Sequence, residues 1–157
     1  MLSDPHYHLV INHLPLMALF IGIMLMIAGF LSKNEIIKAT ALGVFILAAL
    51  SVYFAMASGE RAEEAVEHLP GFDNKVIHEH EEQAENLARM LYTLGLLSVF
   101  ALWSYGKKKV FYNGLCIAAL VLSCIGIYFS YQVGTSGGII HHQEIREKSE
   151  IGPELPD

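Results

Sequence analysis

Eight histidines are the residues of this sequence best suited to chemistry. They come from four separate stretches, and none lies in the two short lysine-bearing connections: His6, His8, His13, His68, His78, His80, His141 and His142. Neutral imidazole is the commonest metal ligand in proteins and the usual axial ligand of a b-type haem. The histidines therefore indicate a metal or haem site, although long polar loops would also collect such residues.

His80 is the histidine that helix periodicity places on an inward face. Residues at three- and four-residue spacing form an apolar stripe: Ile77, His80, Ala84, Leu87, Ala88 and Leu91. His78 falls instead on the polar stripe with Glu82, Glu85 and Arg89. A histidine facing the inside of a bundle is costly unless it has a partner. His80 is therefore either a ligand or a hydrogen-bonded core histidine.

His13 lies beside a proline near the start of the first apolar stretch. Pro15 has no amide hydrogen to donate to the carbonyl of Ile11, so the helix should bend or restart beside Asn12 and His13. A polar pair next to such a break predicts a site. The alternative is that Asn12 caps a helix beginning at the membrane surface.

Two further segments carry candidate ligands. Glu60 and Glu64 are one helical turn apart, so both can lean toward a site or belong to a solvated face. The glycine-rich run 134–138 predicts a flexible turn. That turn would let the tail fold back and carry one of His141 and His142 into the site.

The composition identifies the scaffold that must position these residues. The chain has 157 residues, of which 54% are hydrophobic and 17% charged, and its mean hydropathy is +0.43. Four stretches approach or exceed the roughly 20 apolar residues that cross a bilayer as a helix. We predict one transmembrane domain over 1–145 with a polar tail at 146–157. Its spans are expected at about 9–32, 38–58, 86–105 and 110–133, with an extramembrane helical segment at 59–82.

Charge predicts the orientation of these spans. The two short connections hold five lysines and one glutamate, whereas the rest of the chain holds five basic and fifteen acidic residues. By the positive-inside rule the connections face the cytoplasm, and both termini and every histidine face outward. The expected fold is an all-α, antiparallel four-helix bundle. Such a composition excludes a nucleic-acid-binding protein or a secreted disulfide framework, and Cys116 and Cys124 are too far apart on one helix to bond.

Several short motifs resemble those of a family of small bacterial four-helix integral-membrane proteins. They cover nearly the whole chain: Asn12-His13-Leu14-Pro15, Ser58-Gly59-Glu60, Ala62-Glu63-Glu64, Leu69-Pro70-Gly71, His80-Glu81, and Gly137-Gly138 followed by Ile140, His142, Glu144 and Ile145. The resemblance implies a bacterial membrane protein, which together with the charge distribution predicts the inner membrane with both termini on the periplasmic side. It also implies a recurring polar set of His13, Glu60, Glu64, His80, Glu81, His142 and Glu144. Gln143 departs from the proline usual in that family, and the resemblance supplies no reaction.

Three functions are compatible with this sequence. In an up-down bundle the first and third helices are diagonal, so His13 and His80 would face each other and could ligate haem b. Tyr53, Phe54, Tyr128, Phe129 and Tyr131 could then pack on the macrocycle or form an interfacial belt. Such a protein would carry electrons from quinol or another membrane donor to an outer-side acceptor.

The second function is a non-haem zinc, iron or manganese site with hydrolytic or redox activity. Its ligands would be His13, Glu60, Glu64, His80 and His142, because mixed imidazole and carboxylate ligands suit these ions. The third is a non-catalytic accessory subunit of a membrane complex. Whether the chain is an enzyme, and its oligomeric state, stay open.

Overall fold

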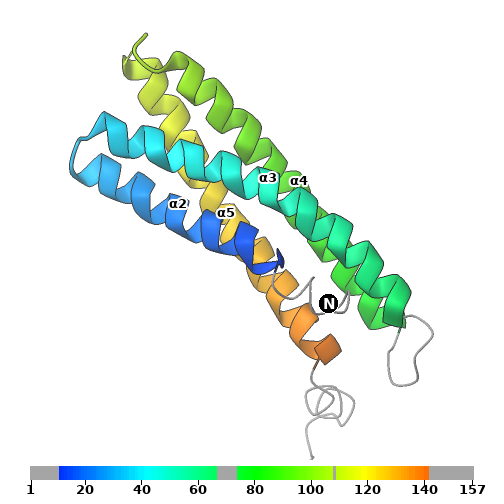
Figure 1. Cartoon of the computed structure of the whole chain (residues 1–157). Coiled ribbons are helices and arrows are strands. Elements are labelled where there is room, and N and C mark those ends of the chain that lie inside the picture. The colour runs from blue at the N-terminus through cyan, green and yellow to red at the C-terminus, as the bar shows by residue number, and fades with distance from the viewer. Residues whose placement is uncertain (1–10, 67–73, 108, 142–157) are drawn as a thin grey trace, which may run out of the picture.

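The chain folds as an all-α bundle. The computed structural model describes residues 11–66, 74–107 and 109–141. These residues form α2 (His13–Leu31), α3 (Glu35–Val66), α4 (Asn74–Ser104) and α5 (Lys109–His141), and consecutive helices run antiparallel (Figure 1). All four helices are long and apolar enough to cross a membrane. The predicted fold class is therefore confirmed, and four such helices are compatible with a multi-pass membrane protein.

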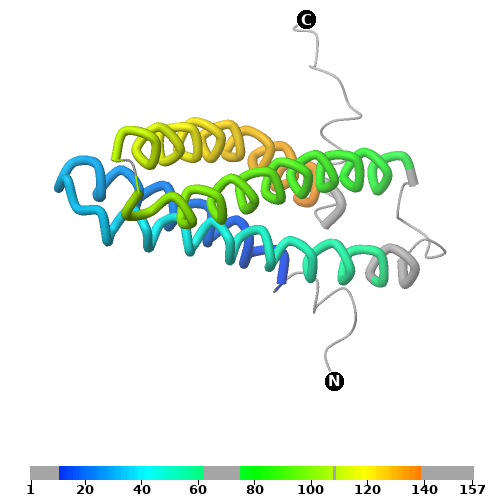
Figure 2. Tube along the Cα trace, turned by 90° about the horizontal axis from the view of Figure 1, so that it is seen from above, coloured from blue at the N-terminus to red at the C-terminus, as the bar shows by residue number. Residues whose placement is uncertain are grey.

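Helices that follow one another in the chain are neighbours in space. α3 packs along α2 and α4, and α5 packs along α4 and less extensively against α2. α2 and α4 are the diagonal pair, as expected for the first and third spans (Figure 2). We call the end with the α2–α3 and α4–α5 turns the lysine end. The opposite end, where α2 and α4 begin and α3 and α5 finish, is the histidine end.

Local sequence determines the α2–α3 turn. The Ser32 amide donates to the Ala28 carbonyl, and Lys33 adopts a positive φ of 53°. Oδ1 of Asn34 then accepts from the amides of Ile36 at 2.9 Å and Ile37 at 3.3 Å, which caps the start of α3. This tight reversal places α3 directly against α2.

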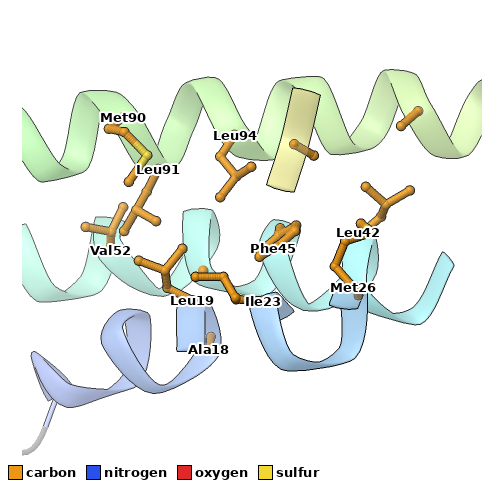
Figure 3. Packing of buried hydrophobic residues seen from close by; sticks show 14 of the residues in the cluster. Ala18, Leu19, Ile23, Met26, Leu42, Phe45, Val52, Met90, Leu91 and Leu94 are labelled. Atoms are coloured by element: carbon orange, nitrogen blue, oxygen red, sulfur yellow. The ribbon is translucent and has the colours of Figure 1, made fainter. Parts of the chain in front are cut away.

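Apolar side chains from three helices fill the centre of the bundle. Figure 3 shows Leu19, Ile23 and Met26 of α2 meeting Leu42, Phe45 and Val52 of α3 and Met90, Leu91 and Leu94 of α4. Gly22 permits this approach, because a Cβ there would collide with the Phe45 ring. The close packing fixes the relative register of the helices, which in turn sets the geometry of the histidine end.

The outer surface of the bundle is also apolar, as lipid contact requires. Exposed side chains include Phe20, Leu47, Leu50, Leu96, Val121 and Ile125. Of the five aromatic residues considered for a haem pocket, four are between 58% and 70% exposed: Tyr53, Phe54, Tyr128 and Tyr131. Phe129 alone of the five packs partly against the core. Their arrangement favours the interfacial-belt interpretation.

The prediction of a flexible turn at 134–138 is wrong. α5 continues through the glycines to His141, so there is no hinge at which the tail folds back. The hydroxyls of Thr135 and Ser136 bond to carbonyls three and four residues earlier, a pattern that Ser and Thr side chains adopt within helices. His142 itself lies outside the described residues.

Two details of the lysine end also differ from expectation. Lys38 lies within α3 and is 3% exposed, rather than in a solvated connection. Its Nζ is 2.8 Å from Oε2 of Glu35 and 2.6 Å from Oδ1 of Asn113, which supply the polar partners that make burial tolerable. Cys116 and Cys124 are both free thiols, as their spacing predicts; Cys116 is buried and Cys124 is exposed.

Candidate functional site

His80 occupies the inward face of α4 at the histidine end. The predicted stripe is confirmed, because Ile77, Leu87, Ala88 and Leu91 are each less than 9% exposed and His80 is half-buried. Nδ1 of His80 lies 2.8 Å from Oγ of Ser136 in α5. His80 is thus held by a specific partner on the adjacent helix.

Ser136 is a buried partner of the His80 ring. Its side chain is buried, and Oγ lies 3.1 Å from the Gln132 carbonyl oxygen and 3.2 Å from that of Val133. Oγ can donate to one of these carbonyls and accept from Nδ1–H of His80, and the direction of the bond between the two side chains depends on the ring tautomer. In either direction the bond orients the imidazole of His80.

Gly137 provides the room for the His80 ring. A Cβ at this position would stand 3.2 Å from Cε1 of His80 and 3.7 Å from Nδ1. Gly134 and Gly138 have no neighbouring atom within 4 Å of an added Cβ. Of these three glycines, Gly137 is therefore the one at which α5 makes space for the imidazole.

Further polar groups are buried at the same end. Ser58 is 4% exposed, and its hydroxyl donates to the Ala55 carbonyl at 2.9 Å. Oδ1 of Asn12 and Oε1 of Gln83 are buried and have no hydrogen-bond partner among the residues that the structure describes. Asn12 occupies the N-cap position of α2, as the capping alternative predicts, but its side chain makes no capping hydrogen bond.

The predicted ligand set is not assembled among the residues that the structure describes. His13 is the first residue of α2 and is exposed, and Glu60 is exposed on α3. The side chain of Glu64 and all of His142 lie outside the described residues. Within residues 11–66, 74–107 and 109–141, no three side chains of His, Cys, Asp or Glu come together closely enough to hold a metal.

His78 behaves as its place on the polar stripe predicts. Its side chain is 80% exposed, and Nδ1 lies 3.4 Å from Oε2 of Glu81. Glu81, which the family resemblance includes in the polar set, therefore faces His78 at the surface. His78 is therefore exposed at the surface, whereas His80, two residues later on α4, is half-buried.

Sequence reasoning missed two residues of this site. The glycine-rich run predicts a flexible turn at Ser136, although a serine hydroxyl can bond to carbonyls of its own helix. Gln83 follows His80 by three residues and so shares its inward face. Helical spacing alone would have identified Gln83.

Comparison with known proteins does not assign the chain to a family. No protein-family profile, curated protein or solved structure matches the chain.

Proposed function

We propose that the histidine end of the bundle is a non-haem metal centre, with the His80 imidazole as a ligand to zinc, iron or manganese. The observation that carries this proposal is the bond from His80 to Ser136 at 2.8 Å. A metal-binding histidine generally donates its other ring N–H to an oxygen acceptor, which fixes the tautomer and the ring orientation. Ser136 supplies that acceptor from the adjacent helix.

The oxygen-rich surroundings favour a bare ion over a macrocycle. The inward polar atoms near this end are the hydroxyl of Ser136 and the amide oxygens of Asn12 and Gln83. The aromatic residues that would cover a porphyrin mostly point outward, and His13 is exposed. Glu64 and His142 remain candidate ligands, because carboxylate and imidazole donors together suit zinc, iron and manganese.

A bis-histidine haem b is the second candidate, and one observation favours it. α2 and α4 are diagonal across the bundle, which is the placement that His13 and His80 need as axial ligands. In this function the protein would pass electrons from quinol or another membrane donor to an acceptor outside the membrane.

The proposed location is the inner membrane of a bacterium, with the histidine end on the periplasmic side. Exposed lysines at the other end support this orientation, because Lys33, Lys107 and Lys109 all lie around the two turns. A site on the periplasmic side would exchange its metal or its substrate with that compartment.

Metal analysis and the visible spectrum of the purified protein test the proposal together. We expect near-stoichiometric zinc, iron or manganese and no Soret band after expression with added haem precursor. A Soret band with a bis-histidine signature would favour haem b instead. Absence of both metal and haem, with a protein partner that co-purifies, would leave the accessory-subunit function.

A further inference from the structure

We propose that the α4–α5 turn binds the headgroup of an anionic phospholipid, with Lys107 and Lys109 holding its phosphate next to an aromatic surface around Trp103. This site lies at the lysine end, so it does not depend on the metal centre proposed around His80. The occupant is a membrane lipid with a net negative charge, such as a phosphatidylglycerol.

An exposed aromatic surface joins α4 and α5 beside this turn. The rings of Phe100 and Trp103 on α4 are stacked with their centroids 5.6 Å apart, and Phe111 of α5 meets Phe100 edge to face at 6.0 Å. These three side chains are between 47% and 62% exposed. α4 ends at Ser104, one residue after Trp103, and tryptophans at the ends of membrane-spanning helices prefer the level of the lipid headgroups. The surface is therefore placed to contact the upper part of a lipid.

The fold of the turn brings a cation onto this surface. Gly106 adopts a φ of 78°, and the Lys107 amide donates to the Ser104 carbonyl at 3.0 Å, so the chain folds back over the end of α4. Nζ of Lys107 lies 3.0 Å from the centre of the Trp103 ring. The ring contact occupies one side of the ammonium, which has three N–H donors. The donors on the other side are available to a phosphate oxygen.

The protein does not balance the positive charge at this turn. Glu35 is the one acidic residue of the two short connections. Its Oε2 lies 2.8 Å from Nζ of buried Lys38, which already matches its charge. Lys109 lies farther away, at 3.7 Å from Oε1 of Glu35, and its side chain is 77% exposed. Lys107 and Lys109 therefore present positive charge that complements a lipid phosphate.

Charge beside an apolar surface favours a lipid over a soluble anion. Inorganic phosphate would contact the two ammonium groups alone, whereas a phospholipid would also cover Phe100 and Phe111 with its acyl chains. Each lysine near an anionic membrane surface strengthens binding about fivefold, which corresponds to about 1 kcal/mol. Lys107 and Lys109 are thus expected to select an anionic lipid from its zwitterionic neighbours.

Fluorescence of Trp103 tests the proposal, because it is the only tryptophan of the chain. The full-length protein is reconstituted in vesicles of phosphatidylcholine and phosphatidylglycerol in equal amounts, with bromine on the acyl chains of either one lipid or the other. Each protein is compared with itself in unbrominated vesicles. We expect brominated phosphatidylglycerol to quench Trp103 more strongly than brominated phosphatidylcholine, and Lys107→Gln to reduce this preference about fivefold.

Lys107→Arg and Lys33→Gln are the matched controls. Lys107→Arg keeps a cation at the turn and should keep the preference. Lys33→Gln removes one exposed charge from the other turn of the same end and should also keep it. Equal reductions in Lys107→Gln and Lys33→Gln would show a general attraction of charge to the membrane surface and would overturn the site.

Three further results would overturn the proposal. Equal quenching of the wild type by the two brominated lipids would mean that no anionic lipid is selected. Weak quenching by both would mean that a protein surface, such as a second copy of the chain, covers Trp103. Loss of the preference when inorganic phosphate replaces chloride at equal ionic strength would identify a free anion as the occupant. None of these outcomes bears on metal binding at His80.

Discussion

The imidazole of His80 lies against the backbone of Gly137, where an added Cβ would be 3.2 Å from Cε1. This close approach joins α4 and α5 at the histidine end. It also explains why a glycine is placed inside a helix, where the residue normally costs about 0.5–1 kcal/mol relative to alanine. The ring cannot keep its position if a side chain is added at Gly137.

Gly137→Ala is therefore expected to displace the His80 ring by a few tenths of an ångström and to weaken metal binding about tenfold. Gly138→Ala is the control, because no atom lies within 4 Å of a Cβ there. Gly138→Ala should leave affinity unchanged and stabilise the fold by about 0.5–1 kcal/mol. Calorimetric titration and thermal unfolding measure both effects, and equal affinities in the two variants would contradict the packing argument.

Ser136→Ala should weaken metal binding by about 10- to 100-fold, because the acceptor that orients His80 is removed. The neighbouring Thr135→Ala provides a matched comparison. Thr135 makes the same kind of bond to carbonyls of its own helix, at 2.8 and 3.0 Å, but is exposed. Metal affinity that falls equally in both variants would point to a general loss of helix stability instead of a lost partner of His80.

The sequence predicts the scaffold well because its signals are long. Four apolar stretches, each about the thickness of the hydrocarbon core, leave few alternatives to a four-helix bundle. The three- and four-residue spacing around His80 also predicts correctly that it faces inward while His78 faces water.

The failed predictions concern residues whose behaviour depends on a neighbouring helix. Glycines at 134–138 favour a turn locally, yet Gly137 is needed where α5 approaches His80, and α5 stays helical throughout. The sequence predicts Lys38 in a connection between helices. In the structure its Nζ donates a hydrogen bond to Oδ1 of Asn113, 75 positions later in the chain. Partners so distant in sequence leave no local pattern.

Lys38 is expected to stabilise the contact between the α2–α3 pair and the α4–α5 pair at the lysine end. Its Nζ contacts Glu35 of its own helix and Asn113 of α5, and it lies 5.1 Å from the centre of the Phe30 ring. Lys38→Ala removes the cation from the Asn113 amide oxygen and the nearer cation from Glu35, whose Oε1 also lies 3.7 Å from Nζ of Lys109. We expect a loss of about 2–3 kcal/mol, near the lower end for a buried pair because Glu35 is partly exposed. Lys33→Ala at an exposed position should change stability by less than about 0.5 kcal/mol, and equal thermal shifts would contradict this account.

Sidedness can be measured with single cysteines in a Cys116→Ala, Cys124→Ala background. A cysteine at exposed His78 should react with a membrane-impermeant maleimide in intact spheroplasts. A cysteine at exposed Lys33 should react only after the membrane is permeabilised, because lysine-rich turns stay in the cytoplasm. The reverse pattern would place the histidine end in the cytoplasm.

The metal content of purified His80→Ala, compared with that of His78→Ala, tests the central claim most directly. The two histidines are two residues apart on α4, yet one is bonded to buried Ser136 and the other is 80% exposed. We predict that wild type and His78→Ala retain close to one equivalent of zinc, iron or manganese and that His80→Ala loses it. Equal metal content in all three proteins, or none in wild type, would contradict a metal centre at His80.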